Sequence, residues 1–142
     1  VGYRANCPFA YGQLGVTQTY CGNPEGGIKN IRQAMSVRLL EPPPSEIDAL
    51  AIAYRDRTDL DISIKAAEEA ARIDPSYVEA QITLCSDHAL GGDLDKASAI
   101  ARRILDTTPE FSIEGYTRRQ PYRDDGTTAR IAAALREAGL PD

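Results

Sequence analysis

The stretch SYVEAQITLCSDHALGGDLDKASAIARRILDTTP, residues 76–109, predicts two consecutive helices joined by a tight break. Ser76 followed by Glu79 has the pattern of a capping box, so we expect it to open the first helix. The Gly-Gly pair at 91–92 ends that helix, and Asp93 is a suitable N-cap for the next. The second helix is expected to end shortly before the proline that closes the stretch. This part of the chain therefore predicts a helix-turn-helix unit.

The same pattern recurs toward the N-terminus at a nearly constant spacing. Pro75 and Pro109 stand 34 residues apart, and a shift of 34 aligns many other positions of the two units. An earlier copy aligns with a shift of 36, and the two extra residues fall in the proline run 42–44, where connection length varies at little cost in free energy. The clearest matched sets are Leu14, Leu50 and Leu84; Gly22, Thr58 and Gly92; Asn23, Asp59 and Asp93; and Ala34, Ala70 and Ile104.

Small side chains stand where the two helices of each unit are expected to cross. Two helices approach to about 8–10 Å only where the side chains between them are short. The matched small residues therefore predict the packed faces, and they are Gly15, Gly27 and Ala34; Ala51, Ser63 and Ala70; and Cys85 and Ala97.

These tandem units resemble the tetratricopeptide repeat (TPR), and the resemblance covers Pro8 to Phe111. It implies an all-α fold, a right-handed α-solenoid of helix-turn-helix repeats, whose concave face binds a protein or peptide partner. We expect the end of a preceding repeat at 1–7, repeats at 8–43, 44–77 and 78–111, and a C-terminal helical cap at 112–142.

The C-terminal segment departs from the repeat pattern. A helix is expected from about Thr127 to Ala138, with an apolar stripe that includes Ile131 and Leu135. Terminal units of a solenoid cover the apolar face of the last repeat. We therefore expect this helix to cover the second helix of the third unit, residues 94–105.

Two short sequence motifs of the C-terminal segment resemble the end of the TPR region in alphaproteobacterial class III adenylate/guanylate cyclases. They are RQPYRD at 119–124 and LREAGLP at 135–141. The resemblance implies a regulatory or scaffolding fragment of a larger signalling protein, because the chain has no room for a cyclase domain beside three repeats. A stand-alone oligomerisation module is a further alternative.

Composition narrows the class of partner. Charged residues make up 26% of the chain and its net charge is −5, which disfavours nucleic acid as a partner. No apolar run is long enough to cross a membrane, so we expect no membrane insertion of this fragment. Three cysteines without a C-x-x-C motif indicate neither disulfides nor zinc and favour a cytoplasmic location. We expect no cofactor, and a homo-oligomer is possible.

The first helix of each unit is expected to line a concave groove. The helical spacing indicates a set of partner-binding candidates that is mixed and partly apolar. This set lacks the paired lysines and asparagines with which some TPR domains bind carboxylates. A second candidate site is a basic cluster that could bind an anion or a protein partner. The alternative is that its arginines form ion pairs with nearby carboxylates of the same chain. The groove set is Phe9, Gly12, Val16, Thr19, Asp48, Ile52, Arg55, Ile82, Ser86 and Ala89, and the basic cluster is Arg118, Arg119 and Arg123.

No arrangement of residues predicts catalysis. Asp87 and His88 are adjacent, and neighbours along a helix do not face one another. His88 also aligns with Tyr54 of the preceding unit, which favours a role in packing. We therefore expect no catalytic residue, no metal ligand and no enzyme activity in this chain.

Overall fold

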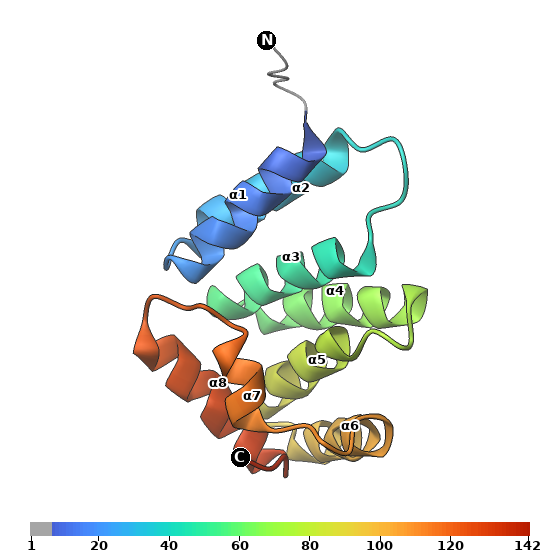
Figure 1. The fold of residues 1–142 in the computed structure, drawn as a ribbon, viewed down its shortest axis with the longest axis vertical. Helices are drawn as coiled ribbons and strands as arrows, with labels where there is room; N and C mark the ends of the chain where they lie inside the picture. The colour runs from blue at the N-terminus through green and yellow to red at the C-terminus, as the bar shows by residue number, and fades with distance from the viewer. Residues whose placement is uncertain (1–6) are drawn as a thin grey trace.

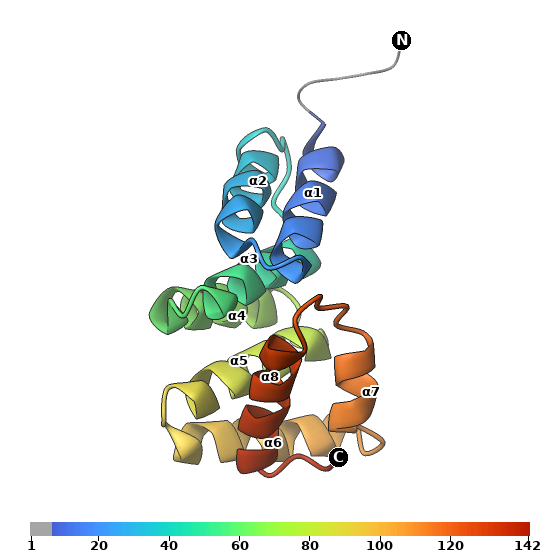
Figure 2. The ribbon, with the colours of Figure 1, turned by 90° about the vertical axis from the view of Figure 1, so that its left-hand side faces the viewer.

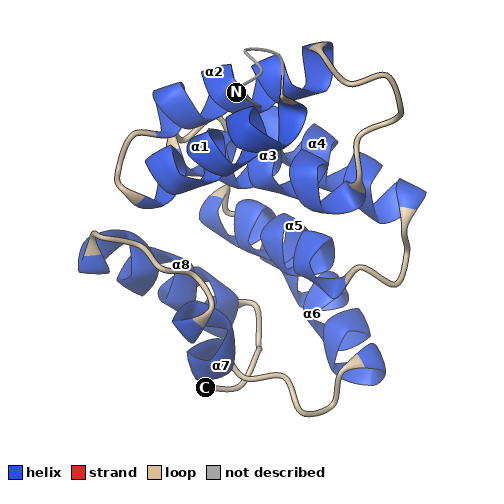
Figure 3. Ribbon diagram, turned by 45° about the horizontal axis from the view of Figure 1, so that its top comes forward, coloured by secondary structure: helices blue, strands red, loops and turns tan. Residues whose placement is uncertain are grey.

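The computed structural model describes residues 7–142, and every regular element within them is a helix (Figures 1 and 3). Residues 1–6 of the expected preceding repeat lie outside the described residues. The helices are α1 (Pro8–Tyr20), α2 (Pro24–Ser36), α3 (Pro44–Asp56), α4 (Leu60–Ile73), α5 (Val78–Leu90), α6 (Leu94–Thr107), α7 (Ile113–Arg118) and α8 (Asp125–Glu137).

The first six helices form three consecutive pairs. Helix α1 packs on α2, α3 on α4, and α5 on α6, and the pairs stack one below another along the molecule (Figure 2). The first helices of the pairs also pack in series, α1 on α3 and α3 on α5, and we name the side that they form the inner face. The expected α-solenoid of helix-turn-helix units is confirmed, whereas the division into repeats at 8–43, 44–77 and 78–111 stays a prediction.

The break within each pair has the same backbone geometry. Gly22, Thr58 and Gly92 all have positive φ angles, of 90°, 71° and 85°. These are the positions that the shifts of 36 and 34 align. Thr58 is the one non-glycine residue of the described chain with this conformation, which disfavours a side chain with a Cβ atom. The repeated spacing therefore reports a repeated turn.

The expected crossing points are confirmed. Gly15 and Gly27 are so close that a Cβ atom added to Gly27 would lie 2.8 Å from the Gly15 carbonyl oxygen and 2.1 Å from Thr19 Oγ1. At the next crossing, the buried Ser63 hydroxyl lies 2.8 Å from the Ala51 carbonyl oxygen. Ala97 is fully buried at the third crossing. Short side chains thus allow the helices of each pair to pack closely.

One helix start differs from the prediction. Asn23 and Asp93 cap α2 and α6 with their side chains, through Gly26 N–H and Lys96 N–H. Ser76 forms no capping box, because its hydroxyl donates to Asp74 Oδ1 at 2.6 Å and α5 begins two residues later. The Ser76 side chain therefore stabilises the short bend after α4 and does not cap α5.

The C-terminal helix packs elsewhere than expected. Helix α8 contacts chiefly α5 and α7, so it covers the third pair mainly from the side of α5, whereas α6 was expected to be the covered helix. Its Ile131 and Leu135 side chains are fully buried in a core shared with α5 and α6. The main-chain N–H of Ile113 also donates to the Pro141 carbonyl at 2.8 Å, which fixes the end of the chain against the start of α7.

Candidate functional site

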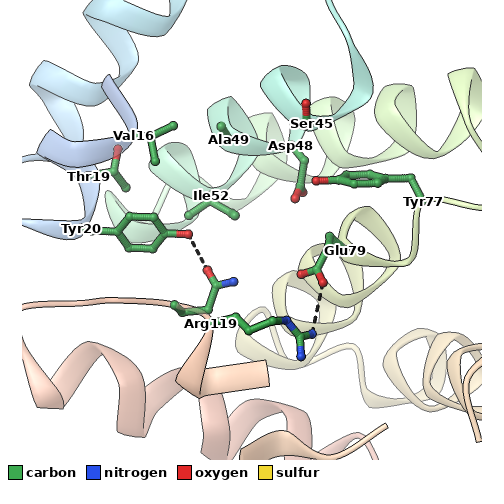
Figure 4. Close-up of a pocket in the computed structure, with 11 residues that line it drawn as sticks. Val16, Thr19, Tyr20, Ser45, Asp48, Ala49, Ile52, Tyr77, Glu79 and Arg119 are labelled. Carbon is green, nitrogen blue, oxygen red and sulfur yellow. Dashed lines mark hydrogen bonds and ion pairs between the residues drawn. The ribbon is translucent and has the colours of Figure 1, made fainter. Parts of the chain in front are cut away.

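The inner faces of α1 and α3 form a groove with two adjoining pockets of about 320 and 260 Å³. Val16, Ser45 and Ala49 line both pockets, so the two lie side by side along the groove. The larger pocket is bounded by residues from four parts of the chain (Figure 4). Its remaining lining residues are Thr19, Tyr20, Asp48, Ile52, Tyr77, Glu79, Arg119 and Gln120.

Residues 119–124, which we name the strap, cross from α7 to the end of α1. The main-chain N–H of Arg123 donates to the Tyr20 carbonyl at 2.9 Å. The Tyr20 hydroxyl donates to Gln120 Oε1 at 2.6 Å, and the rings of Tyr20 and Tyr122 meet edge to face with centroids 4.9 Å apart. The strap therefore closes one end of the groove and leaves the two pockets open.

A buried arginine anchors the strap from below. Arg55 is completely buried, and its guanidinium donates to Ser86 Oγ and to the Tyr122 hydroxyl, both at 3.0 Å. The Tyr122 hydroxyl in turn donates to Asp56 Oδ2 at 2.5 Å, and Arg55 Nε lies 3.3 Å from Asp56 Oδ1. Charge-assisted hydrogen bonds of this kind are stronger than neutral ones and offset part of the cost of burying the cation.

The groove candidates fall into two groups. Phe9, Val16, Asp48 and Ile52 line the pockets, with Phe9 exposed over 70% of its surface and Asp48 and Ile52 forming a nearly buried floor. Arg55, Ile82 and Ser86 are fully buried beneath the C-terminal segment and are not exposed to a partner in this structure. Of the remaining candidates, Gly12 and Thr19 line the pockets, and Ala89 is buried.

The basic cluster is engaged with carboxylates and main chain. Arg118 pairs with Glu114 at 2.5 Å, one turn away. Arg119 pairs with Glu79 across the groove at 3.1 Å, and its guanidinium lies over the Tyr116 ring. Arg123 is exposed, and its main chain holds the strap to α1. The pairing alternative thus describes Arg118 and Arg119, with Glu79 as a partner that sequence spacing did not indicate.

Asp48 has an unusual environment. Only 3% of its surface is exposed, and Oδ1 has no hydrogen-bond partner among the described residues. Burial raises the pKa of Asp48 to about 6; the Thr83 side chain and the Arg55 charge oppose this rise, and the Glu79 charge adds to it. A buried carboxylate oxygen without a hydrogen-bond donor is rare, because its lost hydration is not replaced.

The reactive side chains of Asp87, His88 and Cys85 do not line the groove pockets. Asp87 is buried and contacts Ser63 at 2.5 Å, while the half-buried His88 lies on the other side of α5, by Glu68 and Lys96. Burial raises the pKa of the Cys85 thiol to about 12, which disfavours a thiolate nucleophile. Within residues 7–142, no cluster of histidine, cysteine or acidic residues has metal-binding geometry, and no helix has the length and apolarity to cross a membrane.

Tyr20, Tyr122, Glu79 and Asp56 were not among the sequence candidates. Their contacts join residues up to 100 positions apart, beyond the reach of any repeat pattern. One signal was available at Arg55, because its matched positions in the other units hold Thr19 and Ala89. A large cation at a position that is otherwise small needs a partner from outside the repeat.

No family model matches the chain, and no curated protein matches it. Solved structures do. The crystal structure of MamA superposes with a TM-score of 0.68 at 19% identity, covering 94% of this chain and 77% of MamA. The first TPR of Spaghetti (RPAP3), bound to the HSP90 peptide SRMEEVD, superposes with a TM-score of 0.67 at 15% identity, covering 94% and 99%. At these identities the likeness concerns the fold: the chain has the TPR fold, an α-solenoid of helix-turn-helix repeats.

Proposed function

We propose that the chain is a protein-interaction module that binds an extended peptide segment of a partner in the groove between α1 and α3. The observation that carries the proposal is the pair of adjoining pockets that the strap leaves open. Phe9, Val16 and Ile52 supply apolar surface along them, which suits alternate side chains of an extended peptide. The peptide held by the TPR of Spaghetti supports this use of the fold.

The proposal is tested by selecting peptides from a displayed random library of about 12 residues, long enough to span roughly 40 Å when extended. Selected peptides should bind the unaltered chain, and Ala49→Arg should abolish binding because it fills the region shared by both pockets. Ala133→Arg, on the exposed face of α8, is the matched control and should bind normally. Peptides that bind both variants equally well would show that the groove is not the site.

A regulatory fragment of a nucleotide cyclase is the second candidate, favoured by the resemblance of residues 119–124 and 135–141. It carries with it a cytoplasmic location and the expectation that the fragment is not itself an enzyme. A cyclase domain preceding these repeats in the full-length gene product would support it. The purified fragment should then form no cyclic nucleotide from ATP or GTP with a divalent metal, and measurable product would contradict this part.

Homo-oligomerisation is a third candidate, favoured by apolar side chains exposed near the N-terminal pair. Leu39 and Leu40 are exposed over 100% and 81% of their surfaces, and Phe9 over 70%. Light scattering would show a dimer for the unaltered chain and a monomer for Leu39→Asp/Leu40→Asp. A monomer for both would exclude this candidate.

A further inference from the structure

The charged side chains that line the groove are paired, with one exception. Glu46 pairs with Arg38 at 2.8 Å in the smaller pocket, and Glu79 pairs with Arg119 at 3.1 Å in the larger one. Asp48 forms no ion pair within the described chain, although it lies on the same helix as Arg55. The guanidinium of Arg55 is turned to the other side, where it contacts Ser86, Tyr122 and Asp56.

The shape of the larger pocket fits the one partner that Asp48 lacks. Val16, Ala49 and Ile52 give the pocket an apolar lining, and the Asp48 carboxylate lies at the floor, beside Tyr77 (Figure 4). A long basic side chain has the complementary construction, with methylene groups along its stem and a cationic head at its end. A carboxylate in such a desolvated place forms stronger hydrogen bonds to a cation than a carboxylate in water.

We infer that Asp48 receives the side chain of a lysine or arginine from the peptide that the groove binds. This inference rests on the proposed function and names the chemistry of the partner. The cation would supply the hydrogen-bond donors that Asp48 Oδ1 lacks. The same pocket disfavours a peptide rich in carboxylates, because Asp48 and Glu79 both border it.

Binding of a cation is linked to the ionisation of Asp48. The ionisable groups that face or interact with Asp48 are Arg55 on α3, Tyr20 on α1, Tyr77 just before α5, Glu79 and the buried Asp87 on α5, and Tyr116 and Arg119 at α7. Burial raises the pKa values of the three tyrosines, so they stay neutral between pH 5 and 8. Because Asp48 loses its proton within that range, affinity for a basic peptide should rise with pH from about 5 to about 7.

The experiment compares the unaltered chain with Asp48→Asn and with a matched control, Asp106→Asn on the exposed surface of α6. The peptides selected in the library experiment are the probes, each also synthesised with norleucine in place of its lysine or arginine. Replacing the basic residue should weaken binding to the unaltered chain and to Asp106→Asn by at least about tenfold, and should change binding to Asp48→Asn far less. Circular dichroism and thermal unfolding establish that Asp48→Asn is folded.

A carbon-13 titration of the Asp48 carboxyl group gives a second readout that needs no variant. Its pKa should fall when a lysine peptide binds and stay unchanged with the norleucine peptide. Peptides that need the groove but show no preference for a basic residue would overturn the inference and leave the proposed function standing. Peptides insensitive to Ala49→Arg would overturn both.

Discussion

The main-chain N–H of Arg123 donates a hydrogen bond to the carbonyl of Tyr20, which joins the last loop of the chain to the end of its first helix. Most contacts of a solenoid run between neighbouring repeats. This bond, with the Tyr122 and Gln120 contacts beside it, links the two ends instead. Its stability depends on how well the strap is held by the buried arginine beneath it.

Tyr122→Phe should lower the free energy of unfolding by about 1–3 kcal/mol, because it removes the hydroxyl shared by Arg55 and Asp56 and leaves a buried cation with fewer partners. Urea unfolding measures the change. Tyr122→Leu, which also loses the ring contact with Tyr20, should be destabilised further. Hydrogen exchange of the Arg123 amide should accelerate in both, and unchanged stability and exchange would show that the strap is not held by this hydroxyl.

Gly27→Ala should destabilise the first helix pair, although alanine is favoured over glycine by about 1 kcal/mol within a helix. The added Cβ would meet Thr19 Oγ1 and the Gly15 carbonyl inside the contact distance of any atoms, so α1 and α2 must separate. Gly12→Ala on α1 is the control, because its Cβ meets chiefly the flexible Glu46 side chain. Thermal unfolding should place Gly27→Ala well below Gly12→Ala, and equal melting temperatures would contradict the close approach.

Thr58→Gly should stabilise the chain by about 1 kcal/mol, because a left-handed conformation costs roughly 1–2 kcal/mol in a residue with a Cβ atom. The reciprocal change, Gly92→Thr, should lose a similar amount. No atom lies within 4 Å of the Cβ position at Gly92, so that loss would report backbone conformation alone. Denaturant midpoints of the two variants should therefore move in opposite directions.

Asp87→Asn should change how stability depends on pH. Asp87 is fully buried, its Oδ1 has no partner within the described chain, and burial raises its pKa to about 7, opposed by Arg55 and Ser63. The folded chain therefore keeps this proton to a higher pH than the unfolded chain, where the pKa is near 3.8. The contribution of Asp87 to stability consequently falls as pH rises from about 4 to about 7.

Asparagine carries no such proton, so Asp87→Asn should gain stability relative to the unaltered chain as the pH is raised across that window. A difference of one pKa unit between the folded and unfolded states corresponds to about 1.4 kcal/mol. Urea unfolding at pH 5 and pH 8 measures the gain. Asp106→Asn, at an exposed position, should run parallel to the unaltered chain, and an Asp87→Asn curve that did the same would contradict the assignment.

The repeat could be predicted from sequence because its determinants are local. Gly22, Thr58 and Gly92 mark the turns, and matched small residues mark the crossings, so period and composition were sufficient. Helical spacing also selected Asp48 and Ile52, which line the larger pocket, although their contact with a partner stays a prediction.

The course of the C-terminal segment could not be predicted in the same way. Helix α8 has a single apolar stripe that would fit either helix of the third unit; it packs on α5, and the strap that precedes it runs to the end of α1. That path depends on contacts of Tyr122 and Arg119 with residues far away in the sequence. Whether Arg55 lies in an open groove or beneath a cover is settled by those contacts, so its burial was not visible in the pattern of the repeats.

The hydrogen bond between Arg123 and Tyr20 also affects the order in which the helices unfold. In an open array of repeats, each terminal repeat contacts only one neighbour, so the terminal repeats unfold most easily. Here the first pair of helices is bonded to the strap just before α8. Local unfolding at either end therefore requires this contact to break, which also removes support from the other end. We expect α1 and α8 to lose structure in one cooperative transition, with similar hydrogen-exchange protection at the two ends of the solenoid.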